Sequence, residues 1–179
     1  FITVMPRSRI EDGAFRKHIH DTPPTWVLER DQPNPNDPSG PRDQWLTHRP
    51  TIPSSEGWPI TWVHSTLLKL KQGQRRTLNV TRATQELNDL QRKLEGPKPR
   101  LNTKADIIRK TEAILAAHHV KPFITLTLER FERPEYRQTK PGRPGPHTTY
   151  KRVAKTKWTI HHQPNHDAIT LAHASDGSY

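Results

Sequence analysis

The sequence contains no cysteine and is poor in hydrophobic residues. Without cysteine the chain can form neither disulfides nor thiolate metal sites, so the commonest sequence support for secretion is missing. Only 30% of its 179 residues are hydrophobic, and the mean hydropathy is -0.96. No stretch approaches the roughly 20 apolar residues of a membrane-spanning helix, and no signal-peptide pattern is present. We therefore expect a soluble, cytoplasmic chain with a modest core and no membrane partner.

Motifs for catalysis are lacking as well. The sequence has no glycine-rich phosphate loop, no nucleophile elbow and no His-Glu-x-x-His pattern. Its 11 histidines include three close pairs, but a zinc site needs three or four converging ligands. We interpret these histidines as surface residues that add positive charge below about pH 6.5. No residue of the chain is therefore assigned a catalytic or metal-binding role.

Positive charge is what the sequence has in excess. Lys and Arg number 29 against 18 Asp and Glu, which gives a formal net charge of +11. Such an excess commonly marks a nucleic-acid or other anionic partner. The charge is also segregated, because residues 136–166 include no acidic side chain. The basic residues of this stretch are Arg137, Lys140, Arg143, Lys151, Arg152, Lys155 and Lys157.

Apolar residues at helical spacing predict two consecutive helices. The first spans residues 66–95 and is broken by the Gly-Pro-Lys-Pro sequence at 96–99, since proline cannot continue a helix. The second begins near Thr103, with Asp106 as a short capping box. Two amphipathic helices joined by a short break can pack as an antiparallel hairpin. Their apolar positions are Ala83, Leu87, Leu90 and Leu94 in the first helix, and Ile107, Ile108, Ile114 and Leu115 in the second.

Short strands are expected on either side of this helical hairpin. Alternating or β-prone patterns predict strands at residues 25–30, 43–48 and 59–65 before it, and at 123–131 and 149–162 after it. A proline-rich excursion lies between the first two strands. Near the N-terminus, residues 1–5 have the pattern of a buried strand and residues 9–20 that of a short helix. The fold class that we expect is α+β.

The turn at residues 141–146 presents Arg143 between prolines and glycines. A slim backbone with a projecting guanidinium suits a narrow minor groove. The pattern resembles half of an AT-hook, with Pro141 where the first arginine of the hook would stand. A plain exposed turn, and a solvated strand for the cations that follow it, are the structural alternatives.

Five tryptophans are present in this polar chain. We expect most of them to form a small β core. Trp58, Trp62 and Trp158 lie near basic strands, so stacking on unpaired or flipped bases is the functional alternative for these three.

Several blocks together resemble transposases of bacterial insertion sequences of the DDE type, which have an RNase H-like catalytic fold. The blocks are FITVMPRSRIEDGAFR, EGWPITWVHS, RATQELNDLQRKLEGPKPR, KPGRPGPHTTYKRV and the Ser-Asp-Gly at 175–177. In that family two aspartates and a glutamate bind two divalent metals, typically Mg²⁺, which activate water or a 3′ hydroxyl for attack on a phosphodiester. The resemblance implies that this chain lies between the second aspartate and the glutamate. We therefore expect both of its ends to continue into a longer protein.

The resemblance further implies an internal transposase fragment that is inactive alone and contacts transposon-end DNA. It predicts the end of the catalytic core at 1–22, a proline-rich strand region at 23–65, the helical hairpin at 66–119 and a basic β region at 120–179. A homodimer of the full-length protein and a location at the bacterial nucleoid are implied as well. A free-standing nucleic-acid-binding module and a subunit-docking role for the helical hairpin remain alternatives. The predicted DNA contacts are Arg7, Arg9, Lys140, Arg143, Lys151, Arg152, Lys155 and Lys157.

Overall fold

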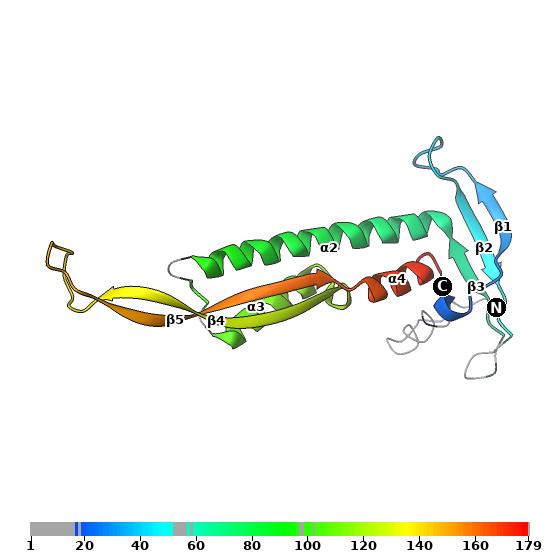
Figure 1. The fold of residues 1–179 in the computed structure, drawn as a ribbon. Coiled ribbons are helices and arrows are strands. Elements are labelled where there is room, and N and C mark those ends of the chain that lie inside the picture. Colours follow the sequence, from blue (N-terminus) through cyan, green and yellow to red (C-terminus); the bar gives the residue numbers. More distant parts are fainter. Residues whose placement is uncertain are drawn as a thin grey trace. The chain divides into compact units, whose positions relative to one another are not determined.

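The computed structural model describes residues 17, 19–51, 57, 59–96, 99–101 and 103–178. The strand expected at residues 1–5 and most of the helix expected at 9–20 lie outside these residues. The described chain combines helices with antiparallel sheets, so the expected α+β class is confirmed (Figure 1). It divides into two compact units, one formed by Phe1–Leu78 with Asn165–Tyr179 and the other by Asn79–Pro164. Within the described residues, no helix has both the length and the apolar character needed to cross a bilayer.

The first unit contains a three-stranded antiparallel sheet in the order β1-β2-β3. Its strands are β1 (Val27–Gln32), β2 (Asp43–His48) and β3 (Trp62–Ser65). β2 matches the expected range, whereas β1 is displaced by two residues from the expected one and β3 is shorter. The displacement follows from pairing, because β1 ends where its partner β2 begins, at the pair Gln32 and Asp43.

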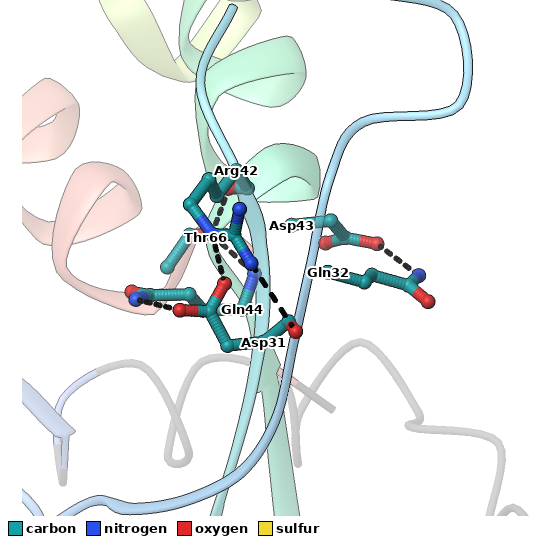
Figure 2. Close-up of polar contacts among 6 residues, drawn as sticks. All are labelled: Asp31, Gln32, Arg42, Asp43, Gln44 and Thr66. Carbon is teal, nitrogen blue, oxygen red and sulfur yellow. Dashed lines mark hydrogen bonds and ion pairs between the residues drawn. The ribbon is translucent and has the colours of Figure 1, made fainter. Parts of the chain in front are cut away.

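A polar network fixes β2 against its neighbours and against the next helix (Figure 2). Arg42 Nε donates to Asp31 Oδ1 at 2.6 Å. The Thr66 hydroxyl accepts from the Gln44 amide and donates to the Arg42 carbonyl.

Asp43 is buried, and its carboxylate accepts from Trp45 Nε1 at 2.9 Å and from Ser65 Oγ at 3.0 Å. Burial alone would raise the pKa of Asp43, but these hydrogen bonds outweigh it and hold that pKa below its ordinary value.

The last described residues return to β3 in the same unit. Helix α4 (His166–Ser175) begins at the N-cap Asn165, whose side chain accepts from the Ala168 amide. After the helix, Gly177 O accepts from the Ser65 amide at 2.8 Å, and the buried His64 contacts the Ser178 hydroxyl at 2.9 Å. Gly177 has a φ of 75°, a backbone conformation that favours glycine. The Ser-Asp-Gly sequence is therefore a structural anchor of this unit.

Helix α2 (Thr66–Glu95) has the expected bounds, and its C-terminal part belongs to the second unit. Helix α3 (Lys104–Ala117) begins at the N-cap Thr103, whose hydroxyl accepts from the Asp106 amide at 3.1 Å as the capping box predicts. His118 contacts Glu86 at 2.8 Å and so joins the C-terminal end of α3 to the C-terminal half of α2, as in an antiparallel pair.

The core of the second unit is shared by these helices and a long β-hairpin. The apolar positions of α2 and α3 pack together with one buried residue from each hairpin strand, and of the expected stripe only Ile108 is exposed. The helical hairpin and the basic β region expected from the sequence thus build one common core. Its buried members are Ala83, Leu87, Leu90, Leu94, Ile107, Ile114, Leu115, Val120, Ile124 and Ile160.

Candidate nucleic-acid interface

A single β-hairpin carries most of the residues predicted to bind DNA. Its strands, β4 (Ile124–Gln138) and β5 (Tyr150–Pro164), each contain 15 residues and pair in continuous antiparallel register. The root of the hairpin packs into the core through Ile124 and Ile160. The outer half extends past the helices of the unit (Figure 1). We call residues 130–156, which comprise this outer half and its turn, the hairpin arm.

The arm is held by pairing and by its turn, since most of its side chains are exposed. Thr139 N donates to Thr149 O at 3.0 Å, which continues the ladder beyond both strands. Inside the turn, Gly145 N donates to the Thr148 hydroxyl at 2.6 Å, and Thr148 N donates to the Gly145 carbonyl. Gly142 has a φ of 143°, so the turn requires glycine there. This geometry leaves Lys140 and Arg143 exposed at the tip.

Cross-strand register divides the arm into two faces. Directly opposed residues in an antiparallel pair project from the same side of the sheet, and successive residues alternate between sides. Arg133 opposes Lys155 and Arg137 opposes Lys151, so one side of the arm is cationic; we call it the basic face. The other side, which we call the tyrosine face, carries the opposed pairs Pro134 with Ala154, Tyr136 with Arg152 and Gln138 with Tyr150.

Four of the predicted DNA contacts are exposed on the arm, namely Lys140, Arg143, Lys151 and Arg152. Lys155 is half-buried, and its ammonium donates to Glu135 Oε1 at 2.8 Å across the ladder. The hydrogen bond from Lys155, helped by nearby cations, lowers the pKa of Glu135. Lys155 is therefore partly neutralised before any DNA phosphate approaches. Arg7 and Arg9 lie outside the described residues.

Lys157 occupies a different environment from the other cations, because only 5% of the residue is exposed. Its Nζ donates to Gly96 O at 2.6 Å and to Leu94 O at 3.4 Å. These are carbonyls at the C-terminal end of α2, where a helix lacks internal partners and favours positive charge. Burial lowers the pKa of the Lys157 ammonium, with a further contribution from the neighbouring Lys155. This position argues against a phosphate contact, and we remove Lys157 from the candidate set.

The outer edge of β5 is covered near its root by the same helix end. Gln91 Oε1 accepts from the Ile160 amide at 2.7 Å, and Asn88 contacts His162 at 3.0 Å. An uncovered strand edge can pair with other chains, so a helix along that edge protects it. The β5 edge is thus held against the end of α2 at the root of the hairpin.

Not all of the three tryptophans considered for base stacking are accessible to a nucleobase. Trp62 is buried in the first unit, and Trp58 lies outside the described residues. Trp158 is partly buried against the core of the second unit. Apart from Phe131, the large aromatic side chains that the arm exposes are Tyr136 and Tyr150. Sequence reasoning overlooked both, and the signal that would have identified them is the strand register, which places them on one face.

Within the described part of the chain, histidines and carboxylates do not converge on a common centre. Among the described residues, no group of three or more His, Asp or Glu side chains could hold a metal ion. His118 contacts Glu86, and His161 contacts Glu129 at 2.9 Å, so these are single pairs. Comparison with protein-family models, curated proteins and solved structures found no match.

Proposed function

We propose that this chain is part of the insertion region of a DDE-type transposase and that its hairpin arm binds DNA. One observation carries the DNA-binding part of the proposal, namely the concentration of positive charge on an exposed ribbon. The arm contains only two acidic residues, Glu132 and Glu135. Its basic residues are Arg130, Arg133, Arg137, Lys140, Arg143, Lys151, Arg152 and Lys155.

The shape of the arm suits a nucleic-acid groove. A two-stranded ribbon fits the major groove of B-form DNA, which is about 12 Å wide. The strand residues 130–138 would extend about 30 Å at the usual rise of about 3.3 Å per residue, which exceeds the width of one groove. At the tip, prolines and glycines flank Arg143, and arginine is one of the side chains that proteins place in the minor groove. Contacts between basic side chains and DNA phosphates position the protein on DNA without strong sequence preference.

The transposase part of the proposal is supported by the resemblance of several sequence blocks. Under it, residues 1–5 would form a strand of an RNase H-like sheet, and the described units would belong to the insertion. The described residues offer no group of ligands that fits a divalent metal, so no metal-dependent step is assigned to them. The Mg²⁺ ligands of the family would lie in parts of the full-length protein outside this chain. The role of the arm would be to hold transposon-end DNA near that active site, at the bacterial nucleoid.

Two alternatives differ in what they require. A free-standing basic module would bind nucleic acid through the same arm but would need no catalytic partner domain. A docking role for the helical hairpin would require its leucine stripe to be exposed to a partner. The leucines of that stripe, Leu87, Leu90 and Leu94, are buried in the core of their own unit, so the stripe no longer supports a docking role. A homodimer of the full-length protein would have to form through another surface.

A salt titration tests the DNA-binding proposal. The log of the binding constant for duplex DNA falls with the log of salt concentration by about 0.9 for each phosphate contacted. Five contacts from Lys140, Arg143, Lys151, Arg152 and Lys155 would give a slope of about -4.5. The variant K140A/R143A/K151A/R152A should lower the magnitude of that slope by about 3.6. Fluorescence polarisation of a labelled duplex measures both slopes.

A matched control changes the same number of charges elsewhere in the same unit. The variant K93A/K104A/K110A/K121A removes four exposed lysines that lie outside the arm. It should keep most of the wild-type slope, because its lysines are not proposed contacts. Equal slopes for wild type and the arm variant would refute the proposal. If the slope fell by the same amount in both variants, the salt dependence would reflect net charge and not contacts made by the arm.

A further inference from the structure

Two tyrosines are exposed on one face of the arm, opposite the face that carries the exposed Phe131. Tyr136 is 69% exposed and Tyr150 is 53% exposed. A single exposed aromatic residue on a protein surface needs no explanation. Two of them at adjacent positions on a ribbon with a strongly basic composition are less ordinary, since neither contributes to the core of its unit.

Strand register places the two rings beside each other. Tyr136 opposes Arg152, and Tyr150 precedes Arg152 by two residues on the same side of the ribbon. Diagonal neighbours of this kind lie about 7–8 Å apart, within reach of aromatic side chains. The tyrosine face therefore presents two rings with one guanidinium. The basic face behind it presents cations at positions 133, 137, 151 and 155.

We propose that Tyr136 and Tyr150 form a stacking surface for unpaired nucleobases, so that the arm binds single-stranded or locally opened DNA in addition to duplex. The inference rests on the proposed DNA-binding function. Bases inside a duplex are already stacked on their neighbours, whereas an unpaired base offers its ring face to an aromatic side chain. Single-strand binding sites combine aromatic stacking platforms with cations that follow the phosphates.

The surroundings of the rings favour a nucleic acid over a hydrophobic protein segment as the occupant. Arg152 lies on the same face, and Lys140 and Lys151 lie within the adjoining turn and strand. A guanidinium can pair with a phosphate or stack on a base. Few aliphatic side chains accompany the rings, since the tyrosine face continues with Pro134 and Ala154. Charge complementarity therefore points to an anionic partner with flat apolar groups.

The test compares two probes and two tyrosine variants in the full chain. The probes are a thymidine oligonucleotide and a mixed-sequence duplex of matched length. Y136V/Y150V removes both rings but keeps residues that suit a strand, and Y136F/Y150F keeps the rings without the hydroxyl groups. F131V removes an exposed ring on the opposite face of the same hairpin as a control. Duplex affinity also reports whether the arm of each variant remains folded.

The valine variant should lose affinity for the thymidine oligonucleotide by about tenfold for each stacked base. Its duplex affinity should stay within about twofold of wild type. The phenylalanine variant and F131V should bind both probes like wild type. Wild-type affinity of the valine variant for the oligonucleotide, equal weakening toward both probes, or equal weakening by valine and phenylalanine would each overturn the inference. Absence of salt-dependent duplex binding by the wild type would instead refute the proposed function.

Discussion

Replacement of Lys157 by methionine tests whether this lysine stabilises the fold, in contrast to the lysines that we propose as DNA contacts. Methionine has a similar length and packs well in irregular core spaces, so the change removes the charge and the hydrogen bonds with little loss of volume. The lost interactions are the hydrogen bonds from Nζ to the carbonyls of Gly96 and Leu94. A hydrogen bond from a charged group contributes about 1.5–3 kcal/mol, and a buried carbonyl left without a partner costs about 1–3 kcal/mol.

The net effect is smaller than these losses, because methionine also removes the cost of burying an ammonium group. The pKa of Lys157 is lowered, first by burial and then by the neighbouring Lys155, so the buried ammonium carries a cost that methionine avoids. We therefore expect Lys157→Met to lower the free energy of unfolding by about 1 kcal/mol. DNA affinity should remain unchanged, since the ammonium points to the helix end. Urea unfolding followed by circular dichroism measures the first quantity and polarisation the second.

Lys155→Met is the matched control, two residues away on the same strand. Its ion pair with Glu135 is partly exposed, and surface pairs contribute about 0–1 kcal/mol. This variant should lose little stability but should flatten the salt dependence of DNA binding by about 0.9 in slope. Refutation would come from a K157M protein that is as stable as wild type or that binds DNA more weakly than K155M does.

The same lysine predicts a pH effect of known sign. A lysine whose pKa is lowered by folding binds fewer protons in the native state than in the unfolded state, between the folded pKa and the ordinary value of 10.5. The free energy of unfolding of the wild type should therefore rise with pH in that window. K157M should lack this rise. A parallel pH dependence in both proteins would show that another group is responsible.

Two further predictions concern the first unit. Asp43→Asn should cost about 1–3 kcal/mol at neutral pH, because an amide cannot accept from both Trp45 and Ser65 as the carboxylate does. Since folding lowers the pKa of Asp43, its contribution is present above the ordinary value of 3.8 and is lost as pH falls through the folded value. The stability difference between the two proteins, measured by urea unfolding, should shrink in acid, and a constant difference would contradict this. Gly177→Ala should lower the thermal midpoint of unfolding, because the φ of Gly177 is 75° and a Cβ there would overlap the Ser65 carbonyl oxygen. An unchanged midpoint would contradict the role of Gly177 as a structural anchor of the first unit.

Local sequence signals predicted α2 and the start of α3, whereas α4 was not expected in the region assigned to β-strands. α2 has the expected bounds because its 3.6-residue apolar spacing and the glycine-proline break act within the segment itself. The N-cap of α3 was predicted for the same reason, since Thr103 and Asp106 interact locally. The lengths of the hairpin strands were harder to predict. β4 continues seven residues past the expected end at Phe131, to Gln138, where both faces are polar and no alternation marks a strand.

The candidate site was predictable only in part. The exposed cations of the tip follow from composition, because a turn rich in proline and glycine cannot be buried in a core. The burial of Lys157 could not be foreseen, since it depends on where α2 ends relative to β5. The placement of Tyr136 and Tyr150 on the same face also depends on the register between the strands, and the turn chemistry alone did not specify that register.

The unbroken register of the hairpin constrains how this sequence can change over evolutionary time. A strand alternates its side chains with a period of two, so loss or gain of one residue within β5 would exchange its two faces while leaving those of β4 in place. Tyr150 would then lie among the cations of the opposite side. Paired insertions, or changes of length within the turn at 139–149, would preserve the arrangement. Homologous chains should therefore differ in length at the tip and, within the strands, only by even numbers of residues.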